Sequence, residues 1–470
     1  MIHPPDNKVS IAPGRFEPLA LEVLAACLPE HEVRILDLRI DSPGELGKQI
    51  DRFKPDVAGI TANNTIHANT AKQVVNRIAS RHPEVNVVVG GFHATMMPQD
   101  FHTPGVNAIF LGWAEKSFPQ YISFLEKGKP LNTIHGIEIL ENGRLMFHNN
   151  GQWDLQPADI PFPRRDLVRK YQNRYRSDMG FKTSLVNTSR GCPSRCSFCG
   201  VWQVSGGHFL LRQPEDVFRE IAELPAGIGR VFFADDNTFI HPGNAARLCR
   251  LIRGAGIKKK YSGYCRSDTI IKNRELMEEW REAGLDNLCV GFEGVDDRRL
   301  QQLNKRNSEE NNARAAEILN AIGIPFRPHF IIDPTFTERE FADILAYVKK
   351  HRLKSPIFPI MTPIPGTPYY EEVKDRIILG HDYFDFAHST VPTTLSAPDF
   401  YQSWFRLYYG SYPLVRNLKM YFLNLLARIT KNSRKRKKYD YLKPAHLFTL
   451  RILAVFLQWK LTRHYKSLSW

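Results

Sequence analysis

Short apolar runs alternate with amphipathic segments along residues 1 to about 145. Four of the runs are predicted as strands, Val33–Leu38, Val57–Thr61, Val87–Val89 and Ala108–Leu111. The first amphipathic segment places Leu21, Leu24 and Leu28 on one helical face. Strands that alternate with helices predict a parallel α/β sheet, and the ligands of such sheets bind beyond the carboxyl ends of the strands.

A second β/α series begins at Phe181, with a β-prone run at Leu185–Thr188. Its later strands are predicted at Arg230–Asn237, Tyr261–Asp268, Asn287–Glu293, Ile324–Ile332 and Phe358–Met361. Residues 146–180, between the two series, carry three prolines. This composition indicates a semi-rigid linker that restricts the movement of the two domains relative to each other. We therefore expect one domain at residues 1–145 and a second at residues 181–385.

Residues 386–470 read as a helical, basic C-terminal extension. Aromatic and leucine side chains recur there at helical spacing, as at Phe400, Trp404 and Tyr408. One interpretation is a helical cap packed on the second domain. The other adds the apolar run Ile452–Leu457 and the cations that follow it, and predicts a helix that lies on an anionic bilayer surface.

Composition is ordinary for a soluble globular chain, with 43% hydrophobic and 24% charged residues among 470. The net charge of +15 is high, and the basic run Lys431–Lys438 predicts partners with phosphate or anionic head groups. The first residues show no basic region followed by an apolar stretch, so we expect no signal peptide. No apolar window is long enough to span a bilayer.

The seven cysteines are distributed unevenly. Four of them are isolated in apolar stretches, which argues against a secreted disulfide framework and for a reducing cytoplasm. The other three, Cys192, Cys196 and Cys199, share one loop. Their spacing fits neither paired-cysteine zinc signature, and free thiols or an incidental zinc site are the alternatives to an iron–sulfur cluster. Three thiolates would leave one iron of such a cluster open for chemistry.

Phe198, just before the last of these cysteines, and the strand before the loop complete a recognisable motif. The stretch resembles the cluster-binding loop of the radical S-adenosylmethionine (SAM) superfamily. The resemblance implies a partial (βα)6 barrel, in which the three cysteines hold a 4Fe-4S cluster whose fourth iron chelates SAM. An electron from a donor such as flavodoxin or ferredoxin would then cleave SAM to a radical that abstracts hydrogen from an unactivated carbon.

Further matches to this superfamily follow the later strands. Asp235 and Asp236 end the strand after the cysteine loop, where a metal pair or a general acid/base pair is the alternative to contact with the SAM amino group. Arg266 suits a carboxylate, the alternative being an ion pair with Asp268. Glu293 matches the glutamate that contacts the ribose. With Phe198, these four residues form the predicted SAM site.

The first domain resembles the cobalamin-binding domains fused to radical SAM enzymes. The resemblance rests on motifs in the family's order, including His3-Pro4-Pro5 and the Gly-Gly loop after the third strand named above. It implies a Rossmann-like domain with these cobalamin residues: Thr61, Gly90, Gly91, His93 and Glu115.

Two features depart from other cobalamin proteins. The Asp-x-His-x-x-Gly pattern that supplies an axial histidine is absent from the loop after the first strand, and the match at Asp100–Gly105 follows the Gly-Gly loop, so we interpret it as coincidence. We therefore expect no protein histidine on cobalt. The chain also begins where the family would have completed most of its first strand, so either the start of the protein lies a few residues upstream or this central strand is shortened.

The layout is similar to that of hopanoid methylases and implies a cobalamin-dependent methyltransferase that acts on an unactivated carbon of a small-molecule or lipid substrate. The alternatives are an oxidative cyclase of the anaerobic porphyrin type, an enzyme that modifies tRNA or a peptide, and a non-catalytic cobalamin-binding regulator. The last has no use for the three loop cysteines. We expect a cytoplasmic protein with peripheral contact to the inner face of the membrane, and we disfavour nucleic acid because no recognition motif accompanies the basic run.

Overall fold

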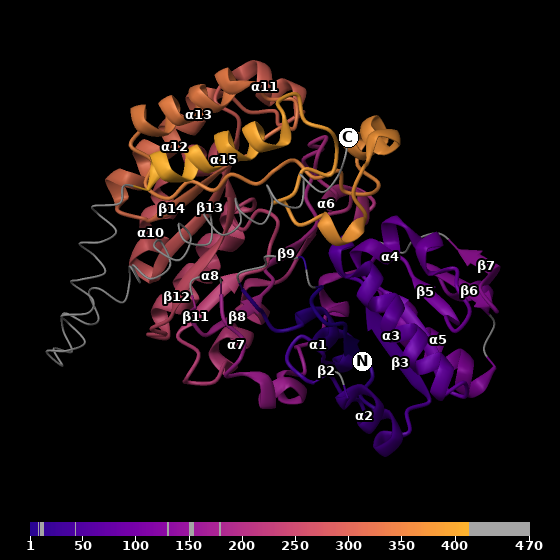
Figure 1. The fold of residues 1–470 in the computed structure, drawn as a ribbon. Helices are drawn as coiled ribbons and strands as arrows, with labels where there is room; N and C mark the ends of the chain where they lie inside the picture. Colours follow the sequence, from indigo (N-terminus) through magenta and orange to yellow (C-terminus); the bar gives the residue numbers. More distant parts are fainter. Residues whose placement is uncertain are drawn as a thin grey trace, which may run out of the picture.

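The computed structural model describes residues 1–7, 9, 14–42, 44–128, 131–149, 155–177 and 180–412. Two α/β units lie side by side, the first in indigo and violet and the second in magenta to orange (Figure 1). The predicted basic run Lys431–Lys438 and the apolar run Ile452–Leu457 lie outside the described residues. Among the residues that are described, no helix is long and apolar enough to cross a membrane.

The first unit is built on a seven-stranded sheet. In spatial order its strands are β2 (Leu36–Asp37), β1 (Ile2–His3), β3 (Val57–Thr61), β4 (Asn86–Gly90), β5 (Ala108–Phe110), β6 (Ile137–Glu141) and β7 (Arg144–Asn149). The first five are parallel, as predicted, and β3 has the predicted bounds. The antiparallel hairpin β6–β7 carries this sheet to Asn149, past the boundary expected at 145. β1 is only two residues long.

Helices cover both faces of this sheet, as the violet ribbons show (Figure 1). They are α1 (Leu19–Ala26), α2 (Glu45–Phe53), α3 (Ala68–Arg81), α4 (Phe92–Met96) and α5 (Ser117–Lys127), with short 3-10 turns at η1 (Thr65–His67) and η2 (Pro98–Phe101). Buried aliphatic residues of β3 and β4 pack between them, among them Ile60, Val87 and Val89. This continuous apolar run is typical of strands covered on both faces.

The second unit contains a five-stranded parallel sheet. Its spatial order is β14 (Phe326–Phe330), β13 (Leu285–Glu293), β12 (Lys260–Arg266), β11 (Arg230–Phe233) and β8 (Thr183–Val186). The predicted last strand contributes two isolated parallel bridges, through Ile357 and Ile360, beyond the β14 edge. The arrangement confirms a partial barrel of six β/α units.

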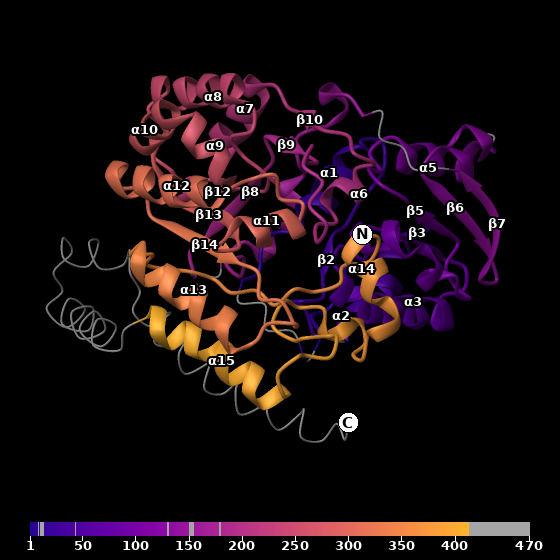
Figure 2. The same ribbon diagram turned by 90° about the horizontal axis from the view of Figure 1, so that it is seen from above.

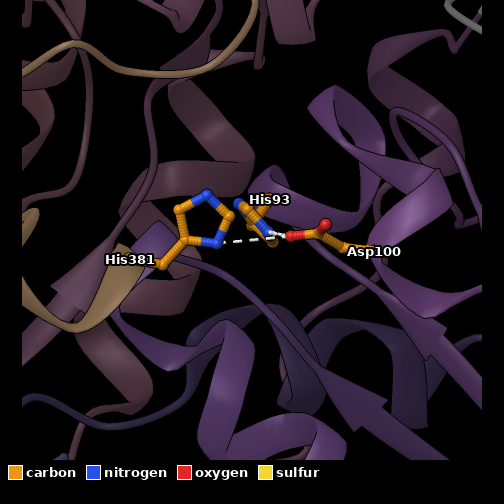
Figure 3. A group of neighbouring side chains, drawn as sticks. All are labelled: His93, Asp100 and His381. Carbon is orange, nitrogen blue, oxygen red and sulfur yellow. Dashed lines mark hydrogen bonds and ion pairs between the residues drawn. The ribbon is translucent and has the colours of Figure 1, made fainter. Parts of the chain in front are cut away.

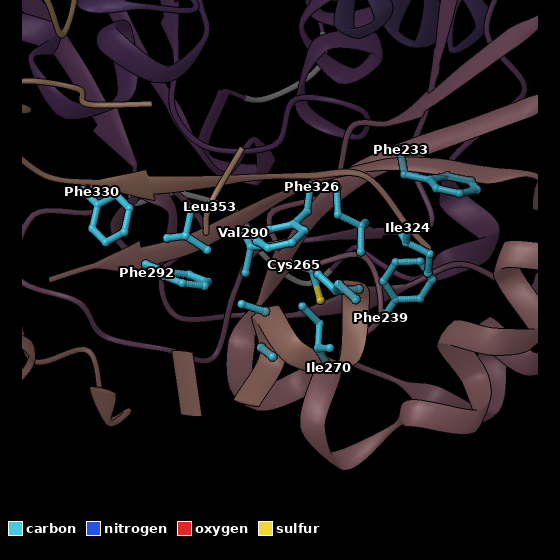
Figure 4. Close-up of a cluster of buried hydrophobic side chains, with 14 of the residues drawn as sticks. Phe233, Phe239, Cys265, Ile270, Val290, Phe292, Ile324, Phe326, Phe330 and Leu353 are labelled. Atoms are coloured by element: carbon cyan, nitrogen blue, oxygen red, sulfur yellow. The ribbon is translucent and has the colours of Figure 1, made fainter. Parts of the chain in front are cut away.

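The helices of this unit follow the outer side of its curved sheet (Figure 2). They are α7 (Pro214–Glu223), α8 (Pro242–Gly254), α9 (Ser267–Lys272), α10 (Arg274–Ala283), α11 (Asp297–Gln302), α12 (Glu309–Ile322) and α13 (Glu338–Lys350). In Figure 2, α8 and α10 lie above the strands and α13 lies below them. Figure 4 shows the large side chains between them and the sheet, such as Phe233, Val290, Phe292 and Phe330, all fully buried. Burying each such side chain stabilises the fold by about 1.5–3 kcal/mol.

The chain beyond the barrel ends, within the described residues, in α14 (Pro368–Val373), η7 (His381–Tyr383) and α15 (Ala397–Ser411). α15 packs against α13, and it buries Phe400 and Trp404 in the barrel core. The indole N–H of Trp404 donates to the carbonyl of Phe358, 2.7 Å away. A helical cap on the barrel is therefore confirmed for this part of the C-terminal extension.

A buried charge cluster joins the two units. Arg165, in η5 (Arg165–Tyr171) of the predicted linker, pairs with Glu17 of the first unit and with Glu220 of α7. Its guanidinium also donates to the carbonyl of Leu185 at the end of β8, 2.6 Å away. Burial and the neighbouring carboxylates raise the pKa of Glu22, a nearby side chain, well above its usual value. The linker thus sets how the two units face each other.

Candidate active site

One cavity of about 660 Å³ opens between the carboxyl ends of the two sheets. Four of the five predicted cobalamin residues line it: Thr61, Gly90, Gly91 and Glu115. The barrel contributes Asn187, Arg190, Gly191 and Asp236 to the opposite wall. A parallel sheet exposes unpaired backbone and loop side chains at its carboxyl edge, and here two such edges share one space.

Backbone groups of the barrel hold the cysteine loop in place between β9 (Ser189–Arg190) and α6 (Val201–Val204). The amide of Ser197 donates to the carbonyl of Leu303 (3.0 Å), and the amide of Tyr369 donates to the carbonyl of Ser197 (3.1 Å). The indole of Trp202 donates to the carbonyl of Cys196 (3.1 Å). The barrel's other loops therefore shape this segment, which has no regular structure of its own.

Cys192, Cys196 and Cys199 fit a cluster better than a single ion. Thiolates on one zinc would lie about 3.8 Å apart, because Zn–S bonds are about 2.3 Å long. Within the described ranges, one group of metal-binding side chains has its ligand atoms within 4.8 Å of one another, and it contains none of these cysteines. In a cuboidal cluster each thiolate binds its own iron, so the sulfurs need not converge.

The electrostatics of the loop make cluster binding proton-coupled. Burial raises the pKa of the Cys199 thiol to about 12 and also raises the pKa of Cys196, where the cations of Lys305 and Arg266 oppose the shift. Both thiols are therefore protonated at neutral pH until metal binds and displaces the protons. Bound iron would then hold them as thiolates.

Phe198, predicted for the SAM site, packs against an apolar cluster at the mouth of the barrel. Its neighbours in that cluster include Leu303, Met361 and Tyr369. Met361 ends the predicted last strand of the barrel, just before a Pro-rich segment. The ring thus anchors the cysteine loop to the barrel.

Asp235, which the sequence predicts as a SAM contact, is buried behind the cavity wall. It is only 2% exposed, and it does not line the cavity. Its carboxylate accepts hydrogen bonds from the amide and hydroxyl of Thr188 (both 2.7 Å) and from the amide of Ser189 (3.0 Å). Burial raises the pKa of Asp235 to about 7. Asp235 therefore positions the backbone that leads into the cysteine loop.

Asp236, the next residue, lines the cavity, and its contact with SAM stays a prediction. Burial raises its pKa to about 6, and a backbone hydrogen bond from Gly191 opposes that shift. Gly191 has a φ of +78°, and a Cβ on it would lie 2.2 Å from the carbonyl oxygen of His208. Only glycine fits at this position beside the first cysteine.

Arg266 and Glu293 end neighbouring barrel strands in ion pairs. The guanidinium of Arg266 donates to Asp268 (2.9 Å) and to the carbonyl of Lys305 (2.8 Å), so the ion pair considered from the sequence is present. The ammonium of Lys305 lies 2.9 Å from Glu293. These contacts hold both side chains at the carboxyl edge of the barrel.

Glu293 has a φ of +64°, in the left-handed region that non-glycine residues rarely adopt. The β13–β14 register shifts at the same place. Such a conformation costs about 1–3 kcal/mol, and proteins keep it chiefly where function needs it. A Cβ on Gly291 would lie 2.3 Å from the Glu293 carboxylate, so this glycine makes room for it.

Gly91 is required by the packing of two loops. It has a φ of +108°, and a Cβ on it would lie 2.9 Å from the carbonyl carbon of Ala62. The amides of Ala62 and His93 donate across this contact, to Gly90 and Ala62 respectively. The glycine therefore lets the loops after β3 and β4 touch each other beside the cavity.

His93 is the predicted cobalamin residue that the structure turns away from the cavity. It is fully buried, and its Nε2 lies 2.9 Å from Asp100. His381 of η7 lies beside His93 and is 3.3 Å from the same carboxylate oxygen (Figure 3). Gly91 and Phe92, at the start of α4, line the cavity. The side chain of His93, the next residue of the helix, therefore points away from the cavity and into the interface between the two units.

These three residues, His93, Asp100 and His381, form an interdomain latch. Burial opposes ionisation of Asp100, but hydrogen bonds from His381 and His93 outweigh it and hold the pKa of this carboxyl below its usual range. Their ligand atoms lie close enough for a metal ion. The ammonium of Lys72, 3.8 Å from Asp100, already supplies a positive charge there and disfavours a cation.

Other histidines bear on the expectation that cobalt has no protein histidine. His102, in the Asp-x-His-x-x-Gly match, lies 2.7 Å from Glu138 on β6 and does not line the cavity. His3 and His67 do line it. Burial lowers the pKa of His3 to about 3, and its Nδ1 pairs with the carbonyl of Pro4 (2.8 Å). The expectation stays a prediction.

Sequence reasoning assigned no role to Arg190, which pairs with Glu115 across the cavity wall. Arg190 comes from β9 of the barrel and Glu115 from the loop after β5. The signal was present, because Arg190 stands two residues before the first cysteine. Its pairing with Glu115 could not be predicted from the sequence, because the two residues are 75 positions apart. His381 was missed for the same reason.

Comparisons with known proteins agree with both halves of the site. The family model described as "Radical SAM superfamily" matches residues 186–348, and that described as "B12 binding domain" matches residues 9–122. The hopanoid C-3 methylase of Methylococcus capsulatus is 28% identical, with 82% of this chain and 75% of that protein covered. An uncharacterized methyltransferase of Pyrococcus horikoshii is 30% identical, with 75% and 78% covered.

Among solved structures, the chain is similar to the cobalamin-dependent S-adenosylmethionine radical enzyme OxsB with aqua-cobalamin and S-adenosylmethionine bound. The TM-score is 0.72 at 16% sequence identity, and 97% of this chain and 71% of that chain are covered. The likeness supports the fold: a cobalamin-binding unit, a partial barrel and the region that follows it.

Proposed function

The chain belongs to the radical SAM superfamily, in the branch that carries a B12-binding domain, and we propose from this premise that it methylates an unactivated carbon of a lipid-like, hopanoid-type molecule. It is a radical SAM enzyme whose cofactors are a 4Fe-4S cluster, SAM and cobalamin. The methyltransferases among its relatives support methyl transfer, and the hopanoid methylase supports the substrate class.

The observation that carries the proposal is the single cavity that joins the carboxyl ends of both sheets. When bound, the cluster and SAM supply hydrogen abstraction and cobalamin supplies the methyl group. Residues of both units line one space, so an acceptor carbon there can be reached from either side. Phe16, Leu19, Phe92 and Trp113 make much of that lining apolar, as an acceptor without charges requires.

We assign the residues of the site by their positions. The cluster ligands are Cys192, Cys196 and Cys199. SAM is contacted by Phe198, Asp236, Arg266 and Glu293, and Asp235 acts through the loop it holds. Cobalamin is contacted by Thr61, Gly90, Gly91 and Glu115, with Arg190 fixing the orientation of Glu115.

The test is to incubate the reconstituted enzyme with a reductant, SAM that carries a trideuterated methyl group, and a hopanoid. We expect the hopanoid to gain the labelled methyl group, with 5′-deoxyadenosine and S-adenosylhomocysteine formed in equal amounts. Cys199→Ala should form neither the methylated hopanoid nor 5′-deoxyadenosine. A second incubation contains a porphyrin in place of the hopanoid. If 5′-deoxyadenosine accumulates there, the porphyrin is oxidised and neither substrate gains the labelled methyl group, the cyclase alternative replaces methylation.

Two partners belong to this proposal: a flavodoxin or ferredoxin as electron donor, and an anionic membrane surface that meets Lys431–Lys438. A polybasic segment gains about 1 kcal/mol per cation near such a surface. We expect the protein to pellet with anionic vesicles and to release as salt rises, since screening weakens the attraction. Retention on RNA instead of vesicles would favour the nucleic-acid partner.

A further inference from the structure

The two faces of the barrel sheet are packed very differently. The face toward the helices is filled by the core shown in Figure 4. On the other face, Tyr264 is 44% exposed, although it belongs to β12 in the middle of the sheet. A closed barrel fills this inner face with layers of side chains. Here the face carries large rings that nothing in the described chain buries completely.

Four rings on and beside this face form a continuous row, which we call the aromatic ladder: Phe16, Phe232, Tyr264 and His329. The ring centroids are 5.7 Å apart from Phe16 to Phe232, 5.4 Å from Phe232 to Tyr264 and 6.2 Å from Tyr264 to His329. The last two contacts are edge-to-face. Such contacts stabilise aromatic pairs and hold their rings in a fixed orientation.

Strand register explains how rings from three strands meet. Tyr264 of β12 pairs with Cys289 of β13, and His329 of β14 pairs with Gly291 of β13. Between the two rings, β13 therefore carries only the small side chain of Cys289 and the hydrogen of Gly291. The rings of Tyr264 and His329 can thus contact each other across β13. The sequence of β13 thus opens the space that the ladder crosses.

The ladder leads from the cavity toward the cofactor residues. Phe16, its first ring, lines the cavity between the two units. Tyr264 precedes Arg266 by two residues on the same face of β12, a distance of about 7 Å along a strand. A molecule lying on the ladder is therefore within reach of whatever Arg266 and Glu293 hold.

We propose that the aromatic ladder is the binding wall for the methyl acceptor, and that the acceptor is a rigid, apolar, polycyclic molecule with any polar group at the His329 end. This inference rests on the proposed function and deepens it. A row of fixed rings offers a broad apolar surface that matches fused rings. The polar atoms of the ladder are the Tyr264 hydroxyl and the His329 nitrogens, so a phosphate-rich ligand such as RNA finds no cationic row among its members.

The direct test is binding of tritiated hopane, presented in detergent micelles, to the reconstituted enzyme without reductant. Tyr264→Ala and Phe232→Ala should each weaken binding about tenfold, the expected effect of losing one ring from an apolar wall. Tyr264→Phe keeps the ring and should bind as the wild type does. Met146→Ala, which removes a side chain 61% exposed on β7 of the other unit, is the matched surface control.

Folding of each variant is checked by cluster absorbance and by iron content, because the ladder contributes no cluster ligand. Protoporphyrin IX serves as a second polycyclic probe, followed by its absorbance. Equal hopane affinity in the wild type and in Tyr264→Ala would overturn the ladder, as would failure of both probes to bind the wild type.

Two outcomes separate the ladder from the proposed function. Ladder-dependent binding of hopane without methylation in the labelled-SAM assay would keep the binding wall and remove the hopanoid methylase activity. Ladder-dependent binding of protoporphyrin IX, with no binding of hopane, would likewise keep the wall and replace the lipid with a macrocycle.

Discussion

The two units meet at one cavity with the same edge of a parallel sheet, yet they build their walls differently. The first unit contributes mainly backbone and loop contacts, as at Gly91, whose missing Cβ lets two loops touch. The barrel contributes charged side chains to the wall, such as Arg190 and Asp236. The difference suits the two cofactors, because a large corrin needs a smooth surface and the amino and carboxylate groups of SAM need oriented charges.

The sharpest way to separate the two walls is Cys199→Ala. Loss of one thiolate should remove the cluster and reduce cleavage of SAM below detection, because an iron loses its anionic ligand. Cobalamin should still bind, since the first unit contributes none of the cysteines. Iron content, visible absorbance and 5′-deoxyadenosine are the measurements. Cys249→Ala, at a buried position in α8, is the control and should keep the cluster.

Gly91→Val should disable the other wall. Valine at a φ of +108°, with its Cβ 2.9 Å from the Ala62 backbone, should weaken cobalamin binding about a hundredfold, the equivalent of about 3 kcal/mol of strain. Spectral titration with cobalamin measures the loss, and the cluster should still assemble. The control is Gly128→Ala, at a φ of +64° with open space around it. This variant has the strain of a non-glycine residue at positive φ but no steric clash, and it should bind cobalamin as the wild type does. Normal binding by Gly91→Val would contradict the loop contact.

Asp235→Asn probes how the barrel wall is held. We expect about a tenfold slower cleavage of SAM and a shifted cluster spectrum, because an amide nitrogen would face donors that now meet a carboxylate. If Asp235→Glu cleaves SAM at the wild-type rate, the negative charge at this position matters more than the length of the side chain.

The same variant tests a pH dependence. Burial raises the pKa of Asp235 to about 7, above its unfolded value near 4, so the native state keeps a proton that the unfolded chain releases. Its contribution to stability is present below pH ~4 and is lost as pH rises through ~7. Asp236, with a pKa of about 6, adds a change of the same sign. Urea unfolding of Asp235→Asn should therefore show a flatter decline over this range.

The smallest effect is expected at the interdomain latch. His381→Ala removes one of the imidazoles at Asp100 and should reduce the free energy of unfolding by about 1 kcal/mol, without loss of either cofactor. His82→Ala, which removes a histidine beside exposed carboxylates, is the control. Stoichiometric zinc in the wild type that disappears in His381→Ala would show that the latch is a metal site instead.

The fold was largely predictable because its signals are local. The strand at Val57–Thr61 has the predicted bounds, and the barrel strands recur where apolar runs end in polar residues. The hairpin β6–β7 was missed because one of its faces is exposed and its pattern resembles that of a polar linker. The site was predictable where ligands are neighbours in sequence, as in the cysteine loop.

The sequence by itself determined the three cluster cysteines and the carboxyl-end loops, because these lie within a few residues of one another and of a strand. Only the tertiary structure decided that His93 turns to Asp100 and His381, that Asp235 holds Thr188 from 47 residues away, and that Tyr264 meets His329 above β13. The reason is physical. Spacing along the chain specifies what covalent neighbours can reach, whereas packing between distant elements selects which way a side chain points and what it touches.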